Sequence, residues 1–143
     1  MTNIYSSFRG PTATAFLEWV TPSSLSSLSP YSSTLSVILN EKGGIIDDTV
    51  ITKHANDAFY VVTNAGRRDR DLSHFKEKLE EWNTSDRAKD GKVELEVLDG
   101  WGLLALQGMD FSCYADFDGS EIFVQDPSRR NTCRPLHHST SEN

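Results

Sequence analysis

The chain has 143 residues, of which 37% are hydrophobic and 24% are charged, as is ordinary for a soluble domain. Its formal net charge of −7 argues against nucleic acid as a partner, because phosphate binding requires clustered Lys and Arg. No apolar run approaches the length of a membrane span, so a membrane is not expected as a partner. The 2 cysteines form neither a disulfide framework nor a metal-binding set.

The first part of the sequence predicts one helix, a connector and one strand. The helix is expected to open at Gly10-Pro11, because proline is tolerated in a first helical turn, and to end at Thr21-Pro22. Residues 23–33 form a serine-rich connector that apolar side chains punctuate, which favours an ordered loop. Apolar residues at every second position of residues 35–39 have the period of a strand.

Two more strands are predicted over residues 45–52 and 59–63, joined by a short polar turn. Three strands this close in sequence favour an antiparallel meander. A turn between the last two strands would place Asp48 opposite Thr63 or Asn64. A slip of one residue would change the facing side chains.

The most informative segment is the Gly-Gly-Ile-Ile-Asp-Asp run at residues 43–48. The two glycines permit a tight turn, and the β-branched isoleucines then start a strand. Because adjacent side chains of a strand point to opposite faces, Asp47 and Asp48 cannot perform the same role. Either carboxylate could lie near apolar neighbours, and the alternation leaves open which one does.

The clearest helix is predicted over residues 72–82. Asp69 and Asp71 lie near its beginning, where the helix dipole favours carboxylates. Apolar residues recur there at spacings of three and four and predict a face that packs in the core: Leu72, Phe75, Leu79 and Trp82.

The later segments are expected to add strands to the sheet. Residues 92–97 alternate charged and apolar side chains, which predicts a half-exposed strand, and residues 103–106 predict a more buried one. Residues 121–125 are expected to form a further strand. Together with the earlier elements, this order predicts an α+β fold, in which helices pack on an antiparallel sheet.

The run from Leu35 to Ile51, LSVILNEKGGIIDDTVI, resembles the folate-binding core of the T-protein of the glycine cleavage system, an aminomethyltransferase. The resemblance covers residues 8–108, an inner piece of that family's longer chain, and residues 109–143 are expected to be a divergent tail of a truncated chain. Later stretches agree with the family in order and spacing: Tyr60–Gly66, Asp71-Leu72, Leu95–Asp99 and Leu103–Gly108.

The resemblance implies a partial folate-binding domain and a specific reaction. The family's T-protein accepts an aminomethyl group carried on the lipoyl arm of the H-protein, transfers the one-carbon unit to tetrahydrofolate and releases ammonia. The resemblance therefore implies tetrahydrofolate as the acceptor, lipoylated H-protein as the partner, no metal, and a mitochondrial location in eukaryotes. Residues 1–7 do not themselves have the character of a mitochondrial presequence.

Three site residues follow from the resemblance. Asp48 matches the family's essential aspartate, the second of its Asp-Asp pair, and is the expected catalytic residue. Val62 and Asn64 match the strand that lines the pterin pocket, where Val62 would pack on the ring. The Asn64 amide has a donor and an acceptor, which suits an aminopyrimidinone edge. The segments that supply the family's glutamate for the pterin and arginine for the folate tail have no counterpart here.

The same residues have plainer interpretations. An Asp-Asp pair after two glycines is more often a turn device or a solvated edge, and Asn64 could be a helix cap or a left-handed turn residue. No further carboxylate or histidine is spaced to complete a metal shell around Asp47 and Asp48. His54 and His74 are expected at the surface. The alternative function is a non-catalytic folate-binding relative or an inactive fragment.

Overall fold

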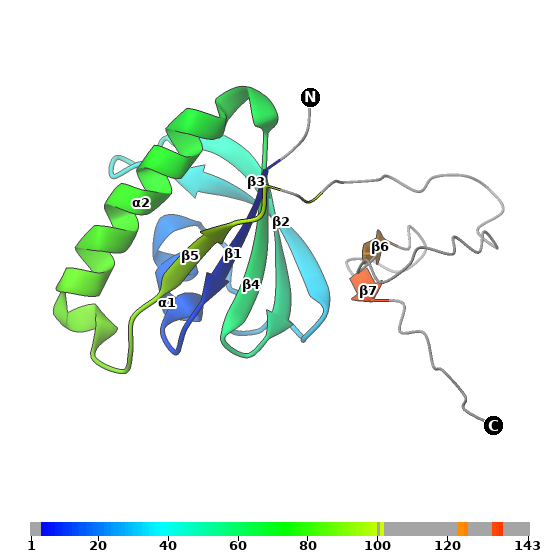
Figure 1. Cartoon of the computed structure of the whole chain (residues 1–143), viewed down its shortest axis with the longest axis horizontal. Coiled ribbons are helices and arrows are strands. Elements are labelled where there is room, and N and C mark those ends of the chain that lie inside the picture. The colour runs from blue at the N-terminus through cyan, green and yellow to red at the C-terminus, as the bar shows by residue number, and fades with distance from the viewer. Residues whose placement is uncertain (1–3, 100, 102–122, 126–132, 136–143) are drawn as a thin grey trace, which may run out of the picture.

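The computed structural model describes residues 4–99, 101, 123–125 and 133–135. Within them, five strands form one sheet in the order β2-β3-β4-β1-β5, and every pair of neighbouring strands is antiparallel. Two helices pack on the same side of this sheet (Figure 1). The predicted α+β fold is therefore confirmed.

The elements follow one another with short connections. A separate hairpin of two short strands, β6 and β7, completes the described residues. In chain order the elements are β1 (Ile4–Arg9), α1 (Ala13–Val20), β2 (Ser32–Leu39), β3 (Ile45–Ala55), β4 (Ala58–Thr63), the 3-10 helix η1 (Ala65–Arg67), α2 (Arg68–Thr84), the 3-10 helix η2 (Asp86–Ala88), β5 (Glu94–Val97), β6 (Phe123–Gln125) and β7 (Cys133–Pro135).

Most of the predicted elements are present. The predicted meander is β2-β3-β4, and both predicted helices are found, α2 beginning four residues earlier than the apolar pattern indicated. The strand expected over residues 121–125 is the shorter β6. The strand expected over residues 103–106 lies outside the described residues. No helix in the described part of the chain is long and apolar enough to cross a bilayer.

Strand β1 was not predicted, although it lies between β4 and β5 in the sheet. Its two central serines break the apolar pattern that usually reveals a strand. Gly10 follows it with a φ of 136°, and a Cβ atom there would lie 2.2 Å from the Lys92 carbonyl oxygen. Only glycine fits this close approach between the end of β1 and the segment before β5.

The turn between β2 and β3 is held by the Asn40 side chain. Its Oδ1 accepts hydrogen bonds from the backbone N–H groups of Lys42 (2.9 Å) and Gly44 (2.8 Å). Gly43 has a φ of 76°, which explains the glycine at this position. The residues of the turn itself therefore account for its geometry, without either aspartate of the following strand.

A bulge at the start of β3 disturbs the expected alternation. Ile38 pairs with Asp47 and Leu39 pairs with Ile45, which leaves Ile46 as an extra residue. Ile46 and Asp47 are consequently both buried, whereas Ile45 is 67% exposed. From Asp47 to Ile51 the strand alternates normally, and Asp48 is exposed.

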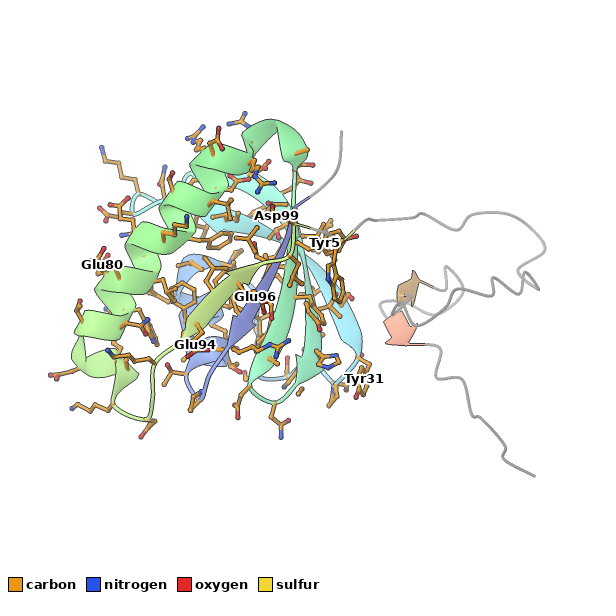
Figure 2. All side chains as sticks on the ribbon, in the orientation of Figure 1. Tyr5, Tyr31, Glu80, Glu94, Glu96 and Asp99 are labelled. Atoms are coloured by element: carbon orange, nitrogen blue, oxygen red, sulfur yellow. The ribbon has the colours of Figure 1, made fainter. Side chains whose placement is uncertain are left out.

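The two faces of the sheet have different environments. On the helix-covered face, Phe8 and Phe59 pack in the core with α1 and α2, and the Phe8 ring lies 5.1 Å from that of Phe75. The opposite side, called here the outer face, carries the residues that alternate with these: Tyr5, Leu35, Asp48, Val50, Tyr60 and Val62. Figure 2 shows Tyr5 and Tyr31 on the side of the sheet away from α2, whose Glu80 points outward.

Candidate functional site

The predicted site residues meet where β3 begins and β4 ends. Thr49 pairs with Thr63, so the preceding Asp48 lies beside Asn64. The Asn64 Nδ2 donates hydrogen bonds to Oδ1 of Asp48 at 2.7 Å and to Oδ1 of Asp47 at 3.1 Å. The expectation that Asp48 lies opposite Thr63 or Asn64 is confirmed.

The structure decides which of the two adjacent carboxylates is buried. Asp47 is 9% exposed and lies on the helix-covered face, whereas Asp48 is exposed at the outer face. An exposed carboxylate can meet a ligand directly, and a buried one must be compensated by its protein neighbours. Asn64 connects the two environments because its amide donates to both side chains.

Asp47 is held as an anion by its neighbours. Burial alone would raise the pKa of Asp47, but hydrogen bonds from Asn64, from Asp71 and from its neighbour's backbone N–H outweigh burial and lower it. The nearby charge of Arg67 acts in the same direction. The side chain that Asn64 bridges to Asp48 is therefore a carboxylate at neutral pH.

Asp71 is the residue of this region that the sequence did not reveal. It lies in the first turn of α2 but is fully buried, at 0% exposure, beneath the sheet. Burial, followed by the hydrogen bond and the negative charge of Asp47, raises the pKa of Asp71 to about 7. A signal was present: Asp71 has helical spacing with Phe75, Lys78 and Trp82, and all four face inward.

Val62 lies on the outer face between two neighbouring strands. It is half-buried and pairs with Val50 of β3 and with Tyr5 of β1. Together with the exposed Asp48 and Asn64, it gives this face an apolar patch with polar groups at one end. Such a combination suits a flat, partly polar ring system.

A row of aromatic side chains runs beside this patch, and the sequence did not reveal it. The rings come from separate segments, and successive centroids lie 5.2–6.3 Å apart. The row consists of Tyr31, His54, Tyr60, Trp101 and Tyr5.

His54 is half-buried in the row and His74 is half-buried on α2, so the expectation of surface histidines was wrong.

The turn and cap interpretations of the site residues are not supported, whereas the exposure of Asp48 also agrees with a solvated edge. Asn64 precedes η1 but makes no side-chain capping hydrogen bond, and its φ of −76° is not left-handed. Asn40, not the Asp-Asp pair, holds the turn before β3. Among the described residues, no three His, Cys, Asp or Glu side chains form a group that could hold a metal ion.

Sequence and structure comparisons agree on one family. The sequence model of the GCVT N-terminal domain matches residues 4–110. The chain is 47% identical over 100 residues to a Schizosaccharomyces pombe protein named "Probable aminomethyltransferase, mitochondrial". It is 45% identical over 102 residues to the mitochondrial aminomethyltransferase of Mesembryanthemum crystallinum. These matches cover 70% and 71% of this chain and 24% of each relative.

The fold also matches a solved structure. The crystal structure of glycine cleavage system aminomethyltransferase T from Bartonella henselae superposes with a TM-score of 0.56 and 28% sequence identity. The match covers 68% of this chain and 24% of that protein, so the chain spans about a quarter of the length of the relatives it matches. The family model, the sequence relatives and the fold agree: this chain belongs to the GCVT N-terminal domain family.

Proposed function

We propose that this chain forms part of the tetrahydrofolate site of a glycine cleavage system aminomethyltransferase. The observation that carries the proposal is the hydrogen bond from Asn64 to the exposed Asp48, next to Val62 on the outer face. The names of the sequence relatives and of the similar crystal structure support the same activity.

The geometry suggests how a pterin would be held. Val62 offers an apolar surface for one face of the ring, and its neighbour Val50 extends that surface. The Asn64 amide group has two N–H bonds, and both carboxylates of the Asp-Asp pair accept from it. Its carbonyl oxygen is then the group that accepts a hydrogen bond from an N–H of the pterin edge.

Asp48 is the group proposed to act on the reacting atoms. An exposed carboxylate at the polar end of the patch can accept a proton from nitrogen or stabilise a developing positive charge. Proton transfer by a positioned side chain typically contributes about 10²–10⁴-fold. The hydrogen bond from Asn64 fixes the direction of the Asp48 carboxylate.

The partner and location follow from the family. We propose that the aminomethyl group arrives on the lipoyl arm of the H-protein and that the one-carbon unit passes to tetrahydrofolate with release of ammonia. Mitochondrial residence is proposed because the relatives with the highest identities reported above carry that location in their names. The reaction as proposed uses no metal.

Calorimetric titration of the chain with tetrahydrofolate tests the proposal. Saturable binding is expected, and Val62→Ala is expected to weaken it about tenfold because one buried apolar contact is worth about 1–3 kcal/mol. The matched control is Leu79→Ala, a deletion of a likewise partly buried apolar side chain on α2 beneath the helix-covered face, which should leave affinity unchanged. No saturable binding, or equal losses in both variants, would contradict the proposal.

A further inference from the structure

Two buried carboxyl groups lie on the helix-covered side of the sheet, away from the outer face that carries the proposed site. Asp71 of α2 is fully buried, and Asp47 of β3 is 9% exposed. If both were ionised, neither oxygen of Asp71 nor Oδ2 of Asp47 would meet a hydrogen-bond donor among the described side chains. Burying two unpaired negative charges side by side costs several kcal/mol per ion.

A single proton bound by the pair removes this cost. A protonated carboxyl is a donor, so a protonated Asp71 can donate to Asp47, which gives a partner to oxygens that otherwise have none. Asp71 is the more buried of the two, and Asp47 already accepts from Asn64. The proton therefore resides on Asp71. The favourable helix dipole is too weak to keep Asp71 ionised, because burial and Asp47 act against it.

We propose that the protonated Asp71 and the ionised Asp47 act as positioning residues that fix the orientation of the Asn64 amide at the substrate site. This inference rests on the proposed function for its relevance to catalysis. In this arrangement the protonated Asp71 donates a hydrogen bond to Asp47, and the Asn64 amide donates to both Asp47 and Asp48.

The charge of Asp47, together with that of Asp48, determines which end of the Asn64 amide faces the two carboxylates. A carboxylate accepts hydrogen bonds only, so it attracts the amide NH₂ group and repels the carbonyl oxygen. Because neither carboxylate can donate to it, the Asn64 carbonyl oxygen is the group left to accept a hydrogen bond at the proposed site. Without the proton from Asp71, the second oxygen of Asp47 would lack a donor, and the carboxylate would be less well fixed.

Several charged groups bear on the Asp71 proton. Asp47 of β3 opposes its loss, whereas Arg67 of η1 and Arg70 on α2 itself favour the ionised form. Burial and Asp47 outweigh the two arginines and keep the pKa of Asp71 near neutrality, at about 7. The positioning arrangement is accordingly intact below neutral pH and weakens as the pH rises above it.

The direct test is nuclear magnetic resonance of the Asn64 side-chain NH₂ group in the full chain without ligand. In Asp71→Leu, hydrogen exchange of this group should be about tenfold faster than in the wild type, because losing one hydrogen bond costs about 1.4 kcal/mol. Asp71→Asn keeps a donor and should exchange as the wild type does. Asp69→Asn is the matched control, an exposed carboxyl in the same helical turn, and should change nothing.

The pH dependence gives a second readout. The Asn64 signals of the wild type should shift with a midpoint near pH 7, and Asp71→Asn should abolish that shift. Unchanged exchange in Asp71→Leu, or a shift that persists in Asp71→Asn, would overturn the inference. Neither measurement uses tetrahydrofolate, so the inference can fail while folate binding is observed, and the proposed function can fail while the hydrogen-bonded arrangement is observed.

Discussion

The two faces of the five-stranded sheet differ in what their side chains contact. The helix-covered face buries large apolar side chains such as Phe8 and Phe59 against α1 and α2. The outer face combines half-buried valines with the exposed Asp48 and Asn64. Fold stability therefore depends mainly on the first face, and the proposed binding function depends on the second.

The Asp-Asp pair illustrates this difference within two consecutive residues. Asp47 turns inward on the side where Asp71 is buried, whereas Asp48 turns outward, and one amide contacts both aspartates of the pair. Neighbouring residues of identical chemistry thus have separate roles because strand geometry assigns them to opposite faces. Variants that affect only one face can test the distinction.

The largest expected effect is on turnover, from a change at the outer face. Under the proposed function, Asp48→Asn should lower the rate of ammonia release from the aminomethylated H-protein by up to about 10⁴-fold, because the amide cannot accept a proton. Tetrahydrofolate affinity and the free energy of unfolding should change little, since Asp48 is exposed. Turnover equal to that of the wild type would remove Asp48 from the mechanism, whereas no turnover in the wild type would favour a non-catalytic folate-binding protein.

On the helix-covered face the expected effect is on stability. Phe8→Ala should lower the free energy of unfolding by about 3–5 kcal/mol, because Phe8 is fully buried and contacts the rings of Phe16 and Phe75. Leu35→Ala on the outer face should cost less than about 0.5 kcal/mol, since Leu35 is 76% exposed. Urea denaturation of both variants measures the contrast, and similar losses would contradict it.

The buried carboxyl pair predicts a pH-dependent stability. The folded pKa of Asp71, about 7, lies above its ordinary value of 3.8, so its stabilising contribution is complete below pH 3.8 and is lost by about pH 7. The stability of Asp71→Asn relative to the wild type should therefore rise across this window, by at most about 4 kcal/mol. The pKa of Asp47 is lowered, so this residue affects stability in the opposite direction. Its stabilising contribution is lost as the pH falls below this window.

Urea unfolding at several pH values measures this difference. Asp69→Asn again serves as the control, because Asp69 is exposed in the same turn of α2. A stability difference between Asp71→Asn and the wild type that stays constant across the window would show that Asp71 titrates as an ordinary surface carboxyl.

The smallest expected effect is at the border of the helix-covered face. Lys78 is 6% exposed; its Nζ donates to Glu41 at 2.6 Å and Glu81 at 2.9 Å and lies 5.3 Å from the Trp19 ring centroid. Lys78→Met keeps the buried stem and should cost about 1 kcal/mol, because both carboxylates are solvent-exposed. The loss should shrink in high salt, and a loss that is independent of salt would instead indicate packing.

Local patterns were sufficient to predict much of the fold. The β2-β3-β4 meander and α2 follow from short-range periodicity, and the turn position predicted Asp48 opposite Thr63 or Asn64, with the register open by one residue. Strand β1 was missed because its partners, β4 and β5, are distant in sequence and its serines conceal the pattern. Pairing between distant segments leaves no local signal.

The inward half of the candidate site could not be predicted for a similar reason. The bulge that buries Asp47 arises from the pairing of β2 with β3, not from either sequence alone. Asp71 matched the pattern of a helix start, where a carboxylate is usually solvated, and only the sheet above α2 makes it a buried acid. The roles of both residues depend on tertiary contacts.

The most direct test of the central claim is to observe where tetrahydrofolate contacts this chain. Titration followed by backbone amide resonances should show saturable shifts at Asp48, Val62 and Asn64 on the outer face. The resonances of Phe16 and Phe75, which lie beneath the helix-covered face, should move little. Shifts confined to α1 and α2, or no saturable shifts at all, would contradict the assignment of the outer face as the folate site.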